Sequence, residues 1–179
     1  MIQVLDYDPA WAVQFNEIHD RVWPYVRDVA IAFEHVGSTS VPGLAAKPVI
    51  DIDVVIPSRA KFSQIVQCLA RAGYAHRGDL GIEDREAFRE SADDLRHNLY
   101  VCSLESLALR NHLTLRNHLR THPEDLDAYA ALKKRVAVEF PDDIDSYVAA
   151  KTDFILSILT QHRFSADGLD RIREVNRRP

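Results

Sequence analysis

The stretch His35-Val-Gly-Ser-Thr-Ser-Val-Pro-Gly-Leu-Ala-Ala-Lys-Pro-Val-Ile-Asp-Ile-Asp53 leads a glycine- and proline-containing segment into the most strand-like part of the chain. Residues 49–56 are rich in β-branched side chains and end at Pro57, which predicts a strand. Because successive side chains of a strand point to opposite faces, Asp51 and Asp53 project from the same side, about 6.5–7 Å apart. Two carboxylates on one side of an apolar strand repel each other and are costly to desolvate, so they need a metal, a basic side chain or open water.

Two interpretations of this aspartate pair stay open on the pattern alone. In the first, Asp51 and Asp53 lie at a wet edge of a sheet or pair with arginines. In the second, they bind a divalent metal, because hard cations such as Mg²⁺ prefer carboxylate oxygens and substrate phosphates.

The segment Gly37-Ser38-Thr39-Ser40 follows a predicted strand over residues 30–36. Such a turn can present backbone N–H groups to a phosphate, although many stretches of this composition are ordinary turns. It is not a P-loop, because five residues instead of four separate Gly37 from Gly43, and no Lys-Ser/Thr pair follows. Lys47 is either a phosphate ligand or a solvated lysine before a proline.

The combination of these features is more specific than each part. A hydrophobic residue and Gly37-Ser38, a spacer of twelve residues, and then Asp51-Ile-Asp53-Val resemble the signature of the nucleotidyltransferase superfamily. More narrowly, residues 35–53 resemble the GrpB family of that superfamily. Further similarity to this family runs through most of residues 4–160, at Tyr7-Asp-Pro-Ala-Trp11, Arg85, Leu119-Arg-Thr-His-Pro123, Tyr129-Ala-Ala-Leu-Lys133 and Tyr147-Val-Ala-Ala-Lys-Thr-Asp-Phe-Ile155.

The resemblance implies an α/β (α+β) fold, with a nucleotidyltransferase-like mixed β-sheet core flanked by helices and a C-terminal helical part packed on it. It implies that Asp51 and Asp53 are catalytic and bind Mg²⁺, and that a nucleoside triphosphate is the substrate or ligand. The residues expected to bind its phosphates are Gly37, Ser38, Thr39, Lys47 and Arg85. His35 belongs to the family motif and is expected to support the Gly37 turn by a hydrogen bond.

The family pattern has a gap in this chain. Active members of the superfamily usually add a third carboxylate from a later strand, and the strand predicted over residues 95–101 offers no acid. In its place stand Asn98, a neutral oxygen ligand, and Tyr100, which either contacts the nucleotide or packs within the strand. The alternatives are a carboxylate lent by the preceding segment, from Glu83, Asp84 or Glu86, or a solvated acidic loop without a role in the site.

Two functions follow from this pattern. The first is a Mg²⁺-dependent nucleotidyltransferase that moves a nucleotidyl group from a nucleoside triphosphate to an unidentified acceptor. The second is a catalytically weak or inactive module that binds a nucleotide or phosphate ligand, linked to coenzyme A metabolism because some family members are fused behind dephospho-coenzyme A kinase. His112, Arg116 and Asn117 lie near one another on one predicted helix. Arg110, Arg116 and Arg120 of this helix either line a nucleotide or RNA groove or lie at the surface.

Composition sets the frame for these expectations. The chain has 179 residues, 46% of them hydrophobic, and a net charge of −5, which suits one folded domain and argues against bulk nucleic-acid binding. The expected partner is a small nucleotide; the oligomeric state is left open. Cys68 and Cys102 stand in apolar company and are expected to be reduced and packed. With no signal peptide and no membrane-spanning run, we expect a cytoplasmic protein without a membrane partner.

The expected organisation is a single domain over residues 1–179, with an α/β core (1–105), a helical part (106–165) and a tail (166–179). Asp8-Pro9 begins a helix that Pro24 is expected to interrupt. The remaining elements expected from periodicity and breakers are a helix over 59–72, two or three strands within 74–101, helices over 106–120, 124–139 and 143–162, and a loosely held end from residue 169.

Overall fold

The structure, a computed structural model, describes residues 1–90 and 96–177. A five-stranded mixed sheet lies at its centre, in the order β1-β2-β5-β4-β3. The strands are β1 (Ala32–Val36), β2 (Ile50–Ile56), β3 (Tyr74–His76), β4 (Arg85–Glu90) and β5 (His97–Ser103). β2 and β5 are parallel, and the other neighbouring pairs are antiparallel. β2, which carries the two aspartates, is therefore an interior strand with a hydrogen-bonded partner on each side.

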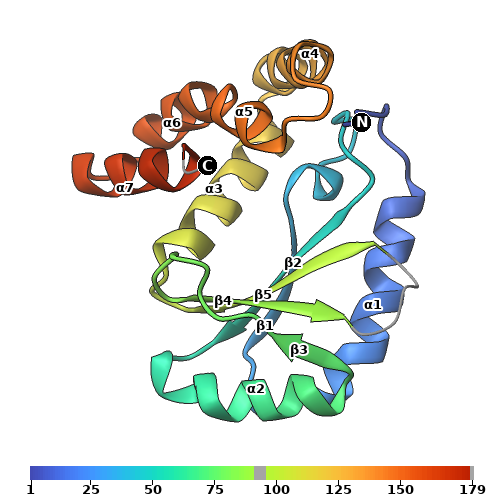
Figure 1. Ribbon diagram of the computed structural model, residues 1–179, viewed down its shortest axis with the longest axis vertical. Helices are drawn as coiled ribbons and strands as arrows, with labels where there is room; N and C mark the ends of the chain where they lie inside the picture. The colour runs from blue at the N-terminus through green and yellow to red at the C-terminus, as the bar shows by residue number, and fades with distance from the viewer. Residues whose placement is uncertain (91–95, 178–179) are drawn as a thin grey trace.

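Helices flank this sheet on two sides (Figure 1). The helices are α1 (Ala10–Val26), α2 (Phe62–Arg71), α3 (Leu107–Thr121), α4 (Pro123–Glu139), α5 (Ile144–Ala149), α6 (Thr152–Gln161) and α7 (Ala166–Asn176), with short 3-10 turns η1 (Ser38–Ser40) and η2 (Arg59–Lys61). α1 and α2 lie along one face of the sheet, and α3 leads from its other side to α4–α7. This is the mixed α/β architecture with a packed helical part that the family resemblance implies.

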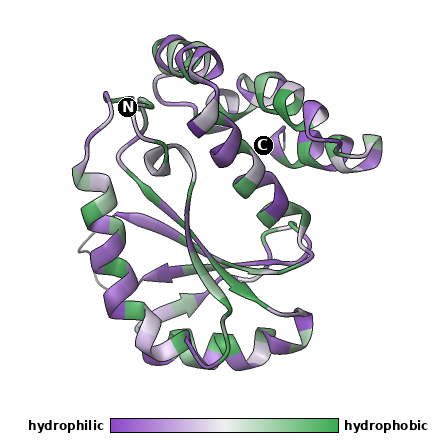
Figure 2. Cartoon of the chain, turned by 180° about the vertical axis from the view of Figure 1, so that it is seen from behind, coloured by the Kyte–Doolittle hydropathy of each residue, from purple (hydrophilic) through white to green (hydrophobic). Residues whose placement is uncertain are grey.

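The alternation of β2 explains its position. Ile50, Ile52, Val54 and Ile56 are fully buried and join the main core with α1 and α2. Figure 2 shows this as hydrophobic stretches within the central strands. Because strand side chains alternate, Asp51 and Asp53 point to the opposite face, toward the helical part. The strand therefore stabilises the core with one face and leaves the other face for polar groups.

The helical part packs on the α/β part through small apolar clusters. Val41 and Leu44, which follow η1, are buried against Leu119 of α3, Tyr129 of α4 and Ile158 of α6. Nearer the sheet, Ala108 and Leu109 of α3 pack on Val55 and Cys102. Cys68 and Cys102 are free and buried, as expected from their apolar neighbours.

The first helix runs through Pro24 to Val26, so the prediction that Pro24 interrupts it is wrong. A proline inside a helix costs about 3 kcal/mol because it removes a hydrogen bond and crowds the preceding turn. Val22 and Val26 on either side of it are fully buried. Each buried valine contributes about 1.5–3 kcal/mol, which offsets the proline and keeps the helix continuous.

The helix predicted over residues 143–162 is two helices, α5 and α6. The amide of Ala150 still donates to Ser146, but Lys151 donates to Val148, one residue closer than an α-helix requires. This tight turn ends α5 and places Lys151 at the junction, immediately before α6 begins. The predicted strand start at Leu95 lies outside the described residues, and β5 itself begins at His97.

The loosely held end predicted from residue 169 is wrong, because residues 166–176 form α7. The Ser165 hydroxyl caps this helix by accepting from the amide of Gly168 at 3.1 Å. Ile172 is buried in a cluster with Leu156, Leu159 and Phe164. Among the described residues, no helix is both long and apolar enough to cross a membrane.

We expect Ile172→Ala to lower the free energy of unfolding by about 2–4 kcal/mol, because it leaves a cavity beneath α7. Urea denaturation followed by circular dichroism measures this change. Arg173→Ala is the matched control, since the Arg173 side chain is 40% exposed and pairs only with Asp170 in the described contacts. Equal stability of the two variants would contradict the docking of α7.

Candidate functional site

Asp53 is fully buried, and one of its two oxygens is unpartnered. Its Oδ2 atom accepts from Nδ1 of His112 on α3 at 2.7 Å. Its Oδ1 atom is buried without a hydrogen-bond partner in the described part of the chain. A buried carboxylate oxygen without a partner is costly, so this position calls for a cation or another donor.

Asp51, two residues before Asp53 on β2, has a different environment. Its Oδ1 atom accepts from Asn98 of β5 at 2.8 Å, across the parallel pairing of Asp51 with Asn98. Burial raises the pKa of Asp51, and the negative charge of Asp53 adds to that increase, while Asn98, His112 and Lys47 oppose it. Among the described contacts, the aspartate pair has an amide and a histidine as partners, not arginines.

Burial opposes the positive charge on His112, but the adjacent Asp53 carboxylate outweighs this and raises the pKa of His112. The Asp53 carboxylate therefore favours the protonated form of His112, whose Nδ1 atom lies 2.7 Å from Oδ2 of Asp53. The contact from His112 serves only Asp53, so a bound cation would meet Asp51 and the unpartnered Oδ1 atom of Asp53.

Gly37 lies directly against Asp51. Its φ is +69°, and a Cβ atom built there would lie 2.3 Å from Oδ2 of Asp51 and 2.9 Å from its Cβ. Only glycine combines this backbone conformation with so close an approach. The turn after β1 is therefore held in contact with the aspartate that β2 presents.

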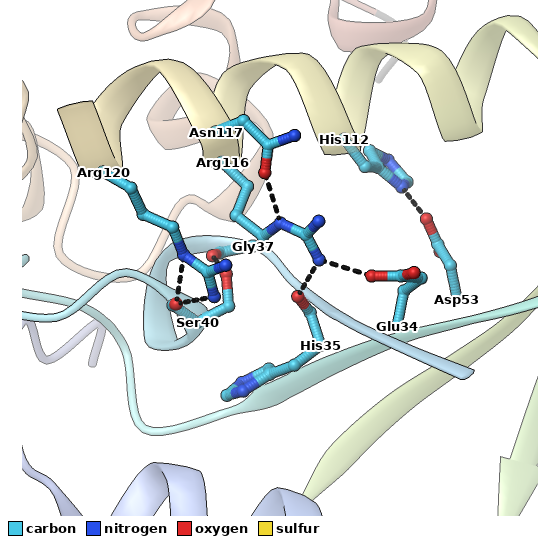
Figure 3. A network of polar contacts seen from close by, with 9 residues as sticks. All are labelled: Glu34, His35, Gly37, Ser40, Asp53, His112, Arg116, Asn117 and Arg120. Carbon is cyan, nitrogen blue, oxygen red and sulfur yellow. Dashed lines mark hydrogen bonds and ion pairs between the residues drawn. The ribbon is translucent and has the colours of Figure 1, made fainter. Parts of the chain in front are cut away.

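Three side chains of α3 fix the turn and β1 from above (Figure 3). Arg120 donates twice to the carbonyl of Ser40, at 2.6 and 3.1 Å. Arg116 donates to Glu34 at 2.6 Å and to the carbonyl of His35 at 2.9 Å. Together with His112 on Asp53, these contacts tie one face of α3 to the strand, the turn and the aspartate pair.

His35 supports the turn from below. Burial and the two nearby arginines lower the pKa of His35 to about 4, so its ring is neutral. Thr39 donates to the carbonyl of Val49 at 3.2 Å, and its hydroxyl lies 3.0 Å from Nε2 of His35. Because that hydroxyl proton is used, Nε2–H of His35 is the donor. The buried Thr39 hydroxyl is thus occupied by the protein itself.

A cavity of about 210 Å³ opens beside Asp51 and brings several expected residues together. It is lined by Ser38, Thr39, Lys47, Val49, Asp51, Asn98, Lys133, Tyr147 and Lys151. Three of these are lysines that come from separate segments of the chain. Such a concentration of cations around a serine-containing turn is suited to a multiply charged anion.

The lysines of this cavity (the lysine cavity) are held in place by aromatic rings and a carbonyl. Nζ of Lys151 lies 3.9 Å from the ring centre of Tyr147, and Nζ of Lys47 lies 5.6 Å from it. Lys133 is buried and donates to the carbonyl of Ala45. Burial and the neighbouring lysines lower the pKa of Lys133 and of Lys151 to about 7, and burial lowers that of Lys47.

Lys133, Lys151, Tyr147 and His112 were not among the expected site residues. Two of them carry a signal in the sequence, because Lys133 and Lys151 each follow a buried tyrosine by four residues, a spacing that predicts one helical face. A lysine on an apolar stripe is unusual and points to a site. His112 carries no comparable signal, since its partner lies 59 residues away.

Arg85 and the acidic residues near it do not reach the lysine cavity. The guanidinium of Arg85, on β4, lies 4.3 Å from the ring centre of Tyr100. Glu83 contacts Arg171 at 2.6 Å, Asp84 contacts Arg59 at 2.7 Å, and Glu86 contacts His76 at 2.6 Å. Each of these carboxylates therefore has a basic partner of its own. The acids at positions 93 and 94 lie outside the described residues.

The described residues hold no cluster of three or more histidine, cysteine or acidic side chains suited to a metal. The donors present are the carboxylates of Asp51 and Asp53 and the amide of Asn98. Carboxylate and amide oxygens are the ligands that Mg²⁺ prefers, and it keeps several waters and substrate phosphates as its other ligands. The unpartnered Oδ1 of Asp53 and the half-buried Asp51 fit this kind of ion.

Solved structures show the class to which this fold belongs. The Cid1 poly(U) polymerase bound to MgATP superimposes with a TM-score of 0.57 over 83% of this chain and 50% of that protein, at 13% identity. The fold is nucleotidyltransferase-like. The crystal structure of GrpB from Enterococcus faecalis is more similar, with a TM-score of 0.78 and 32% identity over 94% of this chain and 98% of that protein.

Residues 1–161 match the model of the GrpB protein family, and the chain belongs to this family. The UPF0157 protein YqkA of Bacillus subtilis is 33% identical over 154 residues, which are 86% of this chain but only 45% of YqkA. A dephospho-CoA kinase of Mycolicibacterium paratuberculosis is 37% identical over 76 residues, 41% of this chain and 19% of the kinase.

Gly37→Ala is expected to lower the free energy of unfolding by about 3 kcal/mol or more, because the new methyl group meets Asp51 in addition to the strain of a left-handed residue. Gly43→Ala is the matched control, since Gly43 has φ +85° but no atom within 4 Å of its Cβ position. Thermal and urea unfolding of both variants measure the difference. A loss from Gly43→Ala as large as that from Gly37→Ala would contradict the close approach to Asp51.

Asp51→Asn is expected to stabilise the protein at neutral pH. Since the pKa of Asp51 is raised in the folded state, its contribution to stability is present at low pH and is lost as pH rises through that pKa. Removal of the charge abolishes this loss, so we expect the melting temperature at pH 7 to rise by at least about 2 °C. Asp127→Asn, at an exposed position of α4, should leave it unchanged.

Melting curves between pH 4 and pH 8 test the sign of this effect. The advantage of Asp51→Asn over the wild type should grow as pH rises and vanish at acid pH. An Asp51→Asn variant that melts below the wild type at pH 7 would overturn this account of the carboxylate.

Proposed function

We propose that this protein is a Mg²⁺-dependent nucleotidyltransferase that moves a nucleotidyl group from a nucleoside triphosphate to an acceptor. The observation that carries the proposal is the lysine cavity, where Lys47, Lys133 and Lys151 surround the Ser38 turn directly beside Asp51. A triphosphate needs several cations and N–H donors together with a metal. The nucleotidyltransferase-like fold supports the same assignment.

The roles of the turn residues follow from their contacts. The first N–H groups of a helical turn have no partner inside it, so the amides of Ser38 and Thr39 are suited to phosphate oxygens. Thr39 acts through its backbone, because its hydroxyl binds Val49 and His35. Gly37 lets the turn approach Asp51, which brings the phosphates next to the carboxylates.

Asp51 and Asp53 would hold Mg²⁺. When bound, this ion would neutralise the phosphate oxygens and support in-line displacement of pyrophosphate. His112 orients Asp53 through the bond to its Oδ2 atom, and Asn98 orients Asp51. The pyrophosphate that leaves would remain near the three lysines, where its added negative charge is stabilised.

The lysines would gain protons when a triphosphate binds. Lys133 and Lys151, with pKa values of about 7, are only partly charged in the free protein. A polyanion raises the pKa of a nearby lysine, so triphosphate binding takes up protons at pH 7.5. The cavity thus gains positive charge when the ligand requires it.

One observation favours the alternative of a binding module with little or no turnover. In the register of β2 with β5, Asn98 lies opposite Asp51 and Tyr100 opposite Asp53, so the neighbouring strand contributes no carboxylate. Glu83, Asp84 and Glu86 contact basic side chains away from the lysine cavity. Such a module could serve coenzyme A metabolism, in line with the similarity to part of a dephospho-CoA kinase.

We expect the purified protein to bind nucleoside triphosphates in the presence of Mg²⁺, as measured by isothermal titration calorimetry with each of the four common triphosphates. Lys151→Met should weaken binding at least about tenfold, since a charge-assisted contact is worth about 1.5–3 kcal/mol. Lys134→Met is the matched control, because Lys134 is exposed on α4 and contacts Asp6 instead. Asp51→Asn/Asp53→Asn should remove the dependence on Mg²⁺.

Equal losses from Lys151→Met and Lys134→Met, or no binding of any triphosphate, would refute a phosphate site in the lysine cavity. Release of pyrophosphate then separates the two functions. Mg²⁺-dependent release with an added acceptor supports the transferase, whereas tight binding without release supports the binding module.

A further inference from the structure

A second cavity, of about 310 Å³, shares none of its lining residues with the lysine cavity. Its walls come from the segment before β4, from α3 and from α7. His112 lines it while contacting Asp53 through Nδ1. This cavity (the α7 cavity) is therefore joined to the aspartate pair by a side chain that belongs to both.

Two polar atoms at the α7 cavity lack partners. Nε of Arg85 and Oδ1 of Asn111 are both buried without a hydrogen bond in the described part of the chain. Nε is a donor and Oδ1 is an acceptor, and a buried donor or acceptor without a hydrogen bond costs free energy. A hydroxyl group both accepts and donates hydrogen bonds, so a hydroxyl compound can satisfy both atoms.

Apart from His112, which pairs with Asp53, the charged side chains around the α7 cavity balance. Arg85 and Arg171 stand against Glu83 and Glu174, and Arg171 contacts Glu83 at 2.6 Å. The remaining wall is apolar, formed by Ile82, Leu107, Ala108, Ile172 and Val175. Balanced charge and apolar walls favour an uncharged molecule over a phosphate or a nucleic-acid end. The volume suits a small molecule.

The two cavities lie at opposite ends of the aspartate pair. Asp51 lines the lysine cavity, and Asp53 follows it along β2. On the neighbouring strand β5, Asn98, Tyr100 and Cys102 follow one another in the same direction. Cys102 pairs with Arg85 of β4, which lines the α7 cavity. In-line phosphoryl transfer places the attacking group opposite the group that leaves.

We propose that the α7 cavity binds the acceptor, and that this acceptor is a small uncharged hydroxyl compound held by Arg85 and Asn111. The inference rests on the proposed transferase function, because that function places pyrophosphate in the lysine cavity. α7 lies beyond residues 1–161, which the family model matches. One wall of the acceptor site is thus built outside the part that defines the family.

Saturation-transfer NMR with a panel of monosaccharides, polyols and nucleosides tests the proposal, in the presence of Mg²⁺ and inorganic triphosphate. At least one compound should bind the wild type and Arg173→Ala, whose side chain is not part of the cavity wall. Asn111→Leu, which removes the acceptor atom, should weaken its binding at least about tenfold. Val175→Trp, which fills the space, should abolish it.

Binding of inorganic triphosphate should be equal in the wild type, Asn111→Leu and Val175→Trp, which also shows that the variants fold. The proposal is overturned if no compound of the panel binds, or if Asn111→Leu binds it as well as the wild type. It is also overturned if Asn111→Leu weakens binding of nucleoside triphosphates but not of inorganic triphosphate, since the α7 cavity would then hold the nucleobase of the triphosphate. If triphosphate fails to bind the wild type while a panel compound depends on Asn111, the transferase function fails and the hydroxyl-compound site stands.

Discussion

Two carboxylates on one interior strand, Asp53 fully buried and Asp51 half-buried, are the constraint around which this structure is arranged. Ile50, Ile52 and Val54 commit one face of β2 to the core, so the aspartates between them must occupy the other face. Desolvation and mutual repulsion make that position unfavourable for two negative charges. Asn98, His112 and the three lysines of the lysine cavity are the groups that compensate this charge. Except for Lys47, which lies just before β2, each of them comes from a segment distant from β2 in the sequence.

α3 is the element that makes the arrangement rigid. Its side chains reach Asp53, Glu34 and the carbonyl groups of His35 and Ser40, so one helix holds β2, β1 and the turn between them. Its apolar side packs on Val55 and Cys102. Because α4 and α6 pack against the far end of α3, the helical part is positioned relative to the aspartates through this same helix. Lys133 and Lys151 therefore reach the lysine cavity through the packing of these helices on α3.

Periodicity and motif were enough to predict the strands, most helices, the mixed sheet and the family. Residues 50–56 show why, since the alternation of apolar and acidic side chains at their start predicts both a strand and the face on which the aspartates lie. Pro24 and the chain end show the limit, because burial of Val26 and of Ile172 stabilises helices that local signals argue against. His112 could not be predicted, since its partner is set by where α3 crosses the sheet. Lys133 and Lys151 lay within matched motifs, but only packing shows that they share a cavity.

The origin of the three lysines has a mechanical consequence. Lys47 belongs to the segment before β2, Lys133 to α4, and Lys151 to the junction of α5 and α6. An anion that contacts all three would connect the sheet to two separate helical segments as a non-covalent crosslink. Occupancy of the lysine cavity would therefore make the molecule stiffer, so that a bound phosphate would have a structural role as well as being a ligand.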